Sequence, residues 1–216
     1  MAESSTRTAQ RALTLLALVC DHGSTSLAEA AREADLPAST ALRLMRTLEA
    51  ADFVVRGADS RYQAGPRLIQ LGAKAFSRDM LVPMSRVPMQ QVVDATGESV
   101  YLSVPGPRDT ALYISIVEGT FSVRHTNWVG RTVPLRGSAA GAVMRGETQD
   151  SGYVVLENTV EPDVTAISAP IGSEERVVAA MSTLVPTYRL DEEKRTRCGQ
   201  ALVRAAAAVS RALGQS

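Results

Sequence analysis

Residues 26–63 read SLAEAAREADLPASTALRLMRTLEAADFVVRGADSRYQ, and this stretch decides how the N-terminal part of the chain folds. Ser26 stands where a helix N-cap is expected, and Glu29 completes a capping box three residues later, which predicts a helix over residues 27–34. Asp35-Leu36-Pro37 then breaks that helix, because the residue before a proline disfavours helical backbone. A second helix follows after a tight turn.

This second helix has an apolar and a polar face. Ser39 or Thr40 is expected to start it. Its apolar residues recur at helical spacing and predict contact with a core: Ala41, Leu44, Met45 and Leu48. The opposite face carries Ser39, Leu42, Arg43 and Arg46. Polar and basic groups near the start of the second helix match a recognition helix in the DNA major groove, where Leu42 can touch a thymine methyl or pack beneath a wing.

A hairpin completes the pattern. Residues 53–56 and 61–63 are strand-like and flank the turn Gly57-Ala58-Asp59-Ser60. Arg56 and Arg61 are expected near its tip, where a planar guanidinium suits phosphate and minor-groove contacts. Residues 1–78 hold ten basic and eight acidic residues, so a small basic stripe must supply the attraction to DNA. The alternative is a helix-turn-helix that serves only for packing.

Two helices flank this motif. Residues 7–22 predict a first helix with Leu13, Leu16, Ala17 and Cys20 on the core-facing stripe, and residues 66–78 predict a connector. The predicted domains are 1–77, a winged helix-turn-helix with its connector, and 78–216. The first helix and the connector are the expected dimer surfaces.

The second domain alternates helices and strands. A helix is expected to start at, or to be interrupted by, Pro83 and Pro88, to run to Asp94 and to be stopped by Gly97. Strands are predicted over residues 99–104, 110–117, 121–126, 164–171 and 176–185, and a last helix over 191–213. This order predicts an α+β domain in which one sheet face is covered and the other can hold a ligand.

Composition excludes several other classes. The 216 residues are 45% hydrophobic and 4% aromatic, which suits aliphatic cores, and no window approaches the ~20 apolar residues of a membrane span. The polar N-terminal segment gives no sign of export, so a cytoplasmic location is expected. Cys20 and Cys198 are far apart and are expected to be buried or half-buried. Neither His22 nor His125 has metal-ligand or triad spacing, and Ser138 lies in Gly-Ser-x-x-Gly rather than Gly-x-Ser-x-Gly. No catalytic residue, metal or cofactor is predicted.

Residues 27–31, 36–48 and 61–68 resemble the DNA-binding part of the IclR family of bacterial transcription regulators. Residues 130–135 and 137–141 resemble its effector-domain signature, and residues 167–171 and 177–182 resemble its last two strands. The resemblance implies a winged helix-turn-helix joined by a connector helix to a GAF- or PAS-like α/β effector domain. It also implies dimers or tetramers.

An effector site is expected on the open sheet face. Alternation places Val164, Ala166 and Ser168 on one face of their strand and Val178, Ala180, Ser182 and Leu184 on one face of the next. Ser138 can cap the helix that starts Ala139-Ala140-Gly141, whose free N–H groups suit a carboxylate. The resemblance implies small organic acids at Ala139, Ala140, Ala166, Ser182 and Leu184. The alternative for these small residues is close packing alone.

The chain departs from the family between Met144 and Val164, where it is a few dozen residues shorter. A more open pocket, an altered effector or a segment left out of the sequence would each account for this. The expected function is a ligand-responsive regulator, a repressor that binds a palindromic operator as a dimer or tetramer. The residues expected to contact DNA are Ser39, Thr40, Leu42, Arg43 and Arg46 on the recognition helix, together with Ser26, Arg56 and Arg61. The rival interpretations are an enzyme acting in the C-terminal pocket and a ligand-insensitive DNA-binding scaffold.

Overall fold

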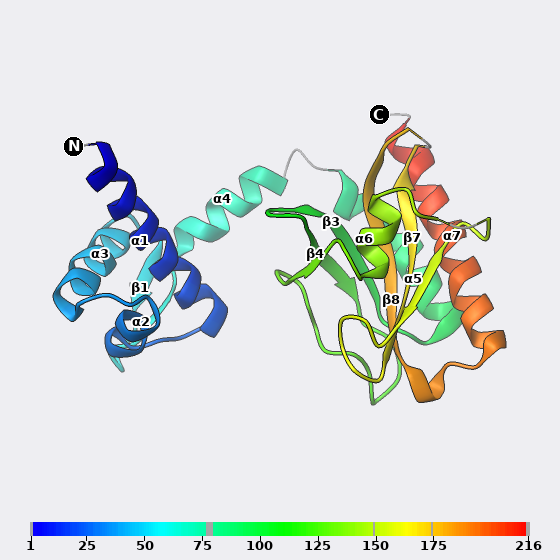
Figure 1. Cartoon of the computed structure of the whole chain (residues 1–216), viewed down its shortest axis with the longest axis horizontal. Coiled ribbons are helices and arrows are strands. Elements are labelled where there is room, and N and C mark those ends of the chain that lie inside the picture. Colours follow the sequence, from blue (N-terminus) through cyan, green and yellow to red (C-terminus); the bar gives the residue numbers. More distant parts are fainter. Residues whose placement is uncertain (1, 77–79, 149, 174, 215–216) are drawn as a thin grey trace. The chain divides into compact units, whose positions relative to one another are not determined.

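The computed structural model describes residues 2–76, 80–148, 150–173 and 175–214, and the chain forms two compact units, Met1–Asp79 and Met80–Ser216 (Figure 1). The boundary expected between residues 77 and 78 lies outside the described residues. None of the described helices is long and apolar enough to cross a membrane.

The first unit is a winged helix-turn-helix. Helices α1 (Ala2–His22), α2 (Leu27–Glu33) and α3 (Ala38–Ala50) precede the hairpin of β1 (Val54–Arg56) and β2 (Tyr62–Ala64), and α4 (Pro66–Phe76) follows. The bounds and the hairpin confirm the predicted order of elements. Thr25 extends the wing by exchanging backbone hydrogen bonds with Tyr62 at 2.7 and 3.0 Å.

Local sequence signals explain most of these elements. The Glu29 N–H donates to the Ser26 hydroxyl and the Ser26 N–H donates to the Glu29 carboxylate, so the predicted capping box is confirmed. The predicted start of α3 is wrong, because Pro37 occupies the N-cap position and no side chain caps the helix. Proline's fixed φ suits the entry to a helix, and its missing N–H costs nothing there.

The core face of α1 differs from the prediction. Leu15, Leu16 and Val19 are buried, whereas Leu13 is 64% exposed and Cys20 is exposed. The predicted stripe is therefore wrong except at Leu16, because the core lies about one residue further round the helix. The expected burial of Cys198 is confirmed.

The second unit is built on one antiparallel sheet with strand order β5-β4-β3-β8-β7-β6. Its strands are β3 (Val100–Gly106), β4 (Thr110–Val117), β5 (Thr132–Pro134), β6 (Val154–Glu157), β7 (Val164–Gly172) and β8 (Val177–Pro186). Helices α5 (Leu81–Thr96) and α7 (Glu192–Leu213) cover one face, and the short α6 (Ala139–Met144) lies on the other (Figure 1). The 3-10 turn η1 (Thr187–Arg189) joins β8 to α7.

Alternation along the strands sorts the side chains between the two faces. Leu102, Ile167 and Met181 belong to the core beneath α5 and α7. Their neighbours Tyr101, Ala166 and Ala180 belong to the core beneath α6. The period of two therefore places Val164, Ala166, Ala180 and Leu184 on the α6 side of the sheet, as predicted. The prediction is wrong for Val178, which packs on the α5 and α7 side near the register shift at Ile171 and Gly172.

The second unit corrects one prediction and adds two strands. No strand forms over residues 121–126, which belong to an extended loop, and the strands β5 and β6 were not predicted. Of the two alternatives for Pro88, the structure has the proline inside α5, and the predicted stop at Gly97 is confirmed by its left-handed conformation at φ 74°. The loop over residues 118–131 matters below, because it carries His125 and Trp128.

Candidate functional site

The exposed face of α3 is the first candidate site. Ser39, Arg43 and Arg46 are exposed and Leu42 is half-buried along a shallow open groove that also includes Thr47. Neither arginine makes an ion pair or side-chain hydrogen bond within the residues that the structure describes. Two guanidinium groups without internal partners on the outer face of a recognition helix are available to an anionic ligand.

The two wing arginines differ from each other. Arg61 donates to the Glu29 carboxylate at 2.9 Å and to the backbone carbonyl of Ser24 at 3.1 Å. Arg56 lies over the Tyr62 ring, 5.8 Å from its centroid. Arg61 therefore braces the wing against the start of α2, and Arg56 is the more available of the two.

The remaining predicted residues of this face are less exposed. Ser26 is half-buried and its hydroxyl is occupied by the capping box, while Thr40 is half-buried at the start of α3. Hydrogen bonds with Ser26, and secondarily the charge of Arg61, lower the pKa of Glu29 to about 2. The carboxylate thus stays ionised beside the wing at neutral pH.

The second candidate site is a closed cavity between α6, the sheet and two loops. Its lining brings together residues from several parts of the sequence: Tyr113, His125, Trp128, Ser138, Ala139, Ala140, Thr159, Val160, Glu161, Val164, Ala166 and Leu184. The space left for the centre of a water molecule is only about 20 Å³, which is room for roughly one water. As the described residues form it, the cavity is smaller than the more open pocket considered from the sequence.

Five of the eight predicted effector residues line this cavity. Ser138, Ala139, Ala140, Ala166 and Leu184 do so. Ser168 and Ser182 face each other across β7 and β8, 2.7 Å apart between hydroxyl oxygens, and both are fully buried. Gly141 is needed for close approach, because a Cβ there would lie 2.0 Å from the Leu135 carbonyl oxygen.

Ser138 is already committed within the fold. Its hydroxyl donates to the Pro134 carbonyl at 2.6 Å and accepts from the Gly141 N–H at 3.1 Å. Helix α6 has only six residues. The arrangement that was expected to seat a carboxylate is therefore mainly a means of holding α6 on the sheet.

Sequence reasoning missed the aromatic half of the cavity. Tyr101, Tyr113, Trp128 and His125 form a ring of edge-to-face neighbours with centroids 4.6–5.8 Å apart. Burial raises the pKa of Tyr113 to about 12, and burial foremost raises the pKa of Tyr101 as well. Both hydroxyls thus remain protonated near neutral pH. The only signal in the sequence was the rarity of these residue types, with one tryptophan and two histidines in the chain.

His125 and Glu161 meet at the edge of the cavity. Their Nε2 and Oε2 atoms are 2.7 Å apart, and the His125 side chain is 4% exposed against 43% for Glu161. Among the residues that line the cavity, these two bring an imidazole and a carboxylate into direct contact.

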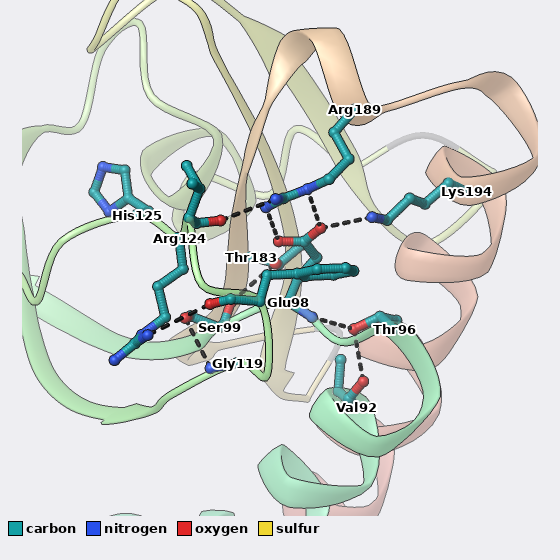
Figure 2. Close-up of polar contacts among 12 residues, drawn as sticks. Val92, Thr96, Glu98, Ser99, Gly119, Arg124, His125, Thr183, Arg189 and Lys194 are labelled. Carbon is teal, nitrogen blue, oxygen red and sulfur yellow. Dashed lines mark hydrogen bonds and ion pairs between the residues drawn. The ribbon is translucent and has the colours of Figure 1, made fainter.

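A buried ion network, also missed, fixes the loop that carries His125. Glu98 is 1% exposed and accepts from Arg189 through both oxygens at 2.9 and 3.0 Å and from Lys194 at 2.6 Å (Figure 2). Arg189 also donates to the Val123 carbonyl at 2.9 Å and lies over the Phe121 ring at 4.2 Å. Residues 98, 189 and 194 are far apart in sequence, so no local pattern could reveal the network.

Comparison with known proteins gives the same division of the chain. A family model described as the IclR helix-turn-helix domain matches residues 8–58, and one described as the bacterial transcriptional regulator IclR C-terminal domain matches residues 73–146 and 145–211. The two segments of the second match meet at residues 145–146, inside the region from Met144 to Val164 that is expected to be shorter than usual in the family. The helix-turn-helix and the cavity-bearing unit thus each have their own family match.

Individual relatives agree with the models. The HTH-type transcriptional regulator XynR of Escherichia coli K12 is 22% identical over 83% of this chain and 85% of its own. The transcriptional repressor IclR of the same strain is 26% identical over 68% of this chain and 54% of its own. A solved IclR homologue from Microbacterium hydrocarbonoxydans, in complex with 4-hydroxybenzoate, has a TM-score of 0.81 at 21% identity and covers 97% of this chain and 100% of its own.

These relatives are regulators rather than enzymes, and the two matched models together span most of the sequence. An enzyme acting in the C-terminal unit is therefore the wrong interpretation. The exposed recognition helix, with an aromatic cavity in a separate unit, is the division of labour expected of a DNA-binding regulator. The chain belongs to the IclR family of bacterial transcriptional regulators.

Proposed function

We propose that this protein is a ligand-responsive repressor that binds a palindromic operator and is modulated by a small organic or aromatic acid. The observation that carries the DNA-binding part is the outer face of α3, where Arg43 and Arg46 are exposed and make no ion pair within the described residues. Repression is proposed by likeness to relatives such as the transcriptional repressor IclR of Escherichia coli.

The residues of the DNA face have separate roles in this proposal. Ser39, Leu42, Arg43 and Arg46 read base edges, because they lie on the outward face of the recognition helix. Arg56 contacts the phosphate backbone from the wing. Thr40, Ser26 and Arg61 act mainly by holding this surface in shape, since each is half-buried or already hydrogen-bonded.

Dimers or tetramers are part of the same proposal. One recognition helix reads too few base pairs for a specific operator, so two copies must bind together. Apolar side chains are exposed on both helices that were expected to form the dimer: Leu13 on α1 at 64%, and Ile69 and Leu71 on α4 at 76% and 40%. Pairing of the recognition helices would then set the half-site spacing.

The effector proposal rests on the cavity beneath α6. Its aromatic lining suits a flat ring, and its ionisable pair provides a partner for an acid. The Microbacterium homologue, which is similar in fold, is in complex with 4-hydroxybenzoate. An effector whose affinities for two DNA-binding states differ by about 1–3 kcal/mol would change operator affinity roughly 5- to 150-fold.

Operator binding tests the first part of the proposal. Purified protein is titrated with DNA from upstream of its own gene and with a scrambled duplex, at two salt concentrations. Arg46→Ala is expected to weaken operator binding by about 1–3 kcal/mol while affecting the scrambled duplex less, and Arg56→Ala to weaken both and lower the salt slope by about 1. Arg86→Ala removes the same charge from an exposed position on α5 and should leave the affinities for both duplexes unchanged. Equal binding of wild type to both duplexes would refute the proposal.

A thermal-shift panel tests the effector part against the scaffold alternative. A ligand at 100 times its Kd stabilises the fold by roughly 2.7 kcal/mol. A panel of aliphatic and aromatic acids, including 4-hydroxybenzoate, should therefore contain members that raise the Tm of the second unit. A flat panel would favour a ligand-insensitive DNA-binding scaffold.

A further inference from the structure

His125 is held from behind by contacts that fix its orientation. The Tyr101 hydroxyl donates to the Thr126 carbonyl at 2.6 Å, and His125 Nδ1 lies 3.0 Å from both that hydroxyl oxygen and the Thr126 carbonyl oxygen. Nδ1 is therefore held between a hydroxyl and a carbonyl oxygen, and the ring cannot turn without losing both contacts. Nε2, on the other side, faces the Glu161 carboxylate, which can only accept, so Nε2 is the atom that donates to an anion.

Glu161 is held much less firmly than its partner. It lies in the turn between β6 and β7, which is closed by the Asn158 N–H donating to the Val164 carbonyl at 2.9 Å. Its side chain is 43% exposed, and no other contact of its carboxylate is found in the described part of the chain. Glu161 can therefore turn into water while His125 stays in place, since only Glu161 has solvent beside it.

The cavity behind this pair offers a second polar group. Trp128 lines the cavity and is only 8% exposed. Its indole Nε1 is buried and has no hydrogen-bond partner among the described residues. A buried donor without an acceptor is costly, so such a donor in a cavity wall points to an acceptor supplied by a ligand. Carboxylate and phenol oxygens are both acceptors.

We propose that the Glu161 carboxylate acts as a built-in substitute for the effector: it occupies the anion position at His125 in the empty protein, and the effector's carboxylate takes its place. This inference rests on the proposed function and names the residue pair that selects for acids. The exchange conserves charge at His125, because one carboxylate leaves as another enters. The turn over residues 158–163 is released at the same time, which gives the cavity the room that it lacks when closed.

Three consequences distinguish this exchange from ordinary packing. A neutral isostere of the acid offers His125 only an uncharged acceptor, which makes a weaker hydrogen bond than a carboxylate, so the affinity ratio of benzoate to benzamide measures the exchange. Removing the Glu161 charge removes the competitor and raises that ratio. Removing the imidazole removes the anion position and lowers it. A loosened turn alone would change the affinities for both ligands together and leave the ratio unchanged.

The experiment measures binding of benzoate, 4-hydroxybenzoate and benzamide to the full chain by the fluorescence of Trp128, the only tryptophan. Glu161→Gln is expected to raise the affinity for benzoate about tenfold, which is the gain when a competing carboxylate that occupies the anion position nine-tenths of the time is removed. Benzamide does not compete for that position, so the benzoate-to-benzamide ratio rises by the same factor. His125→Asn is expected to abolish the preference. Glu157→Gln is the matched control, because it removes the same charge from the same hairpin, where Glu157 pairs with Arg195 outside the cavity.

The outcomes separate the two proposals. If wild type binds the acids and Glu161→Gln leaves the ratio unchanged, the substitution mechanism is wrong and the acid effector stands. If Glu161→Gln binds acids that wild type does not, the substitution mechanism is supported, and the Glu161 carboxylate excludes the acids from the wild-type cavity. If neither wild type nor any variant binds an acid, both proposals fail. Far-UV circular dichroism of each variant checks that it is folded. The decisive variant is Glu161→Gln, which should fold because the Glu161 side chain is 43% exposed.

Discussion

Replacing Glu98 by glutamine tests the role of the buried ion network most directly. The substitution keeps the shape of the side chain but removes the charge that faces two cations. Arg189 and Lys194 are 18% and 10% exposed at the side chain, so neither can be fully solvated where it lies. The variant therefore leaves the positive charges of Arg189 and Lys194 close together, largely shielded from water and without their anion.

The expected loss can be set from this geometry. Removing one partner of a buried pair costs about 3–5 kcal/mol, because the remaining charge is left uncompensated. All three nitrogen–oxygen contacts of 2.6–3.0 Å lose the negative charge of their acceptor, and the amide NH2 places a donor against a donor in at least one of them, which favours the upper part of that range. For a domain of this size each kcal/mol lowers the Tm by about 2–4 °C, so a fall of roughly 10 °C or more is expected.

Urea unfolding followed by Trp128 fluorescence is the suitable assay, because the only tryptophan lies in the second unit and reports its transition alone. Glu147→Gln is the control: it breaks an exposed ion pair, in which the Glu147 side chain is 54% and the Arg145 side chain 31% exposed, and it should change stability much less. A loss for Glu98→Gln no larger than that of the control would refute the reasoning. Acid binding should also weaken, since Arg189 anchors the loop that carries His125.

Three further predictions concern other parts of the chain. The folded pKa of Glu29 is depressed to about 2, so its contribution to stability is present above the unfolded pKa and is lost as the pH falls toward 2. Acid unfolding followed by circular dichroism should show this loss of stability in wild type, and Glu29→Gln should make stability depend less on pH in that range. A thiol reagent should modify one cysteine per native chain, exposed Cys20, and two after denaturation, because Cys198 is buried and burial raises its pKa to about 11. Gly141→Ala should destabilise the second unit in urea and weaken acid binding, because its methyl group would collide with the Leu135 backbone; unchanged stability would show that α6 moves freely.

The elements that could be predicted from the sequence are those whose signals are local. The capping box at Ser26, the left-handed glycine after α5 and the alternation along β7 each depend on residues only a few positions apart. The strand over residues 110–117 was predicted with its observed bounds for the same reason. These signals establish the element and its face, and through them the layers of the second unit.

The failures have a common physical cause. Residues 121–126 have the β-branched and aromatic composition of a strand, yet their partners are side chains from distant elements, such as Tyr101 for Thr126 and Arg189 for Val123. Strand propensity measures fit to a pleated surface and cannot show whether a neighbouring strand is available. The same distance hid the cavity pair, since His125 and Glu161 are 36 positions apart.

The stretch between Met144 and Val164 includes the part of the cavity wall that can open most easily. Helix α6 ends at Met144 and β6 begins at Val154, so the wall over the cavity is left to the turn after β6. In that turn Val160 is 41% exposed and Glu161 is held through one ion pair. A segment with so little buried apolar surface opens at a lower free-energy cost than a packed helix would. A proposed acid effector therefore loses little affinity to opening this turn, and its contacts with His125 and the aromatic side chains should decide binding.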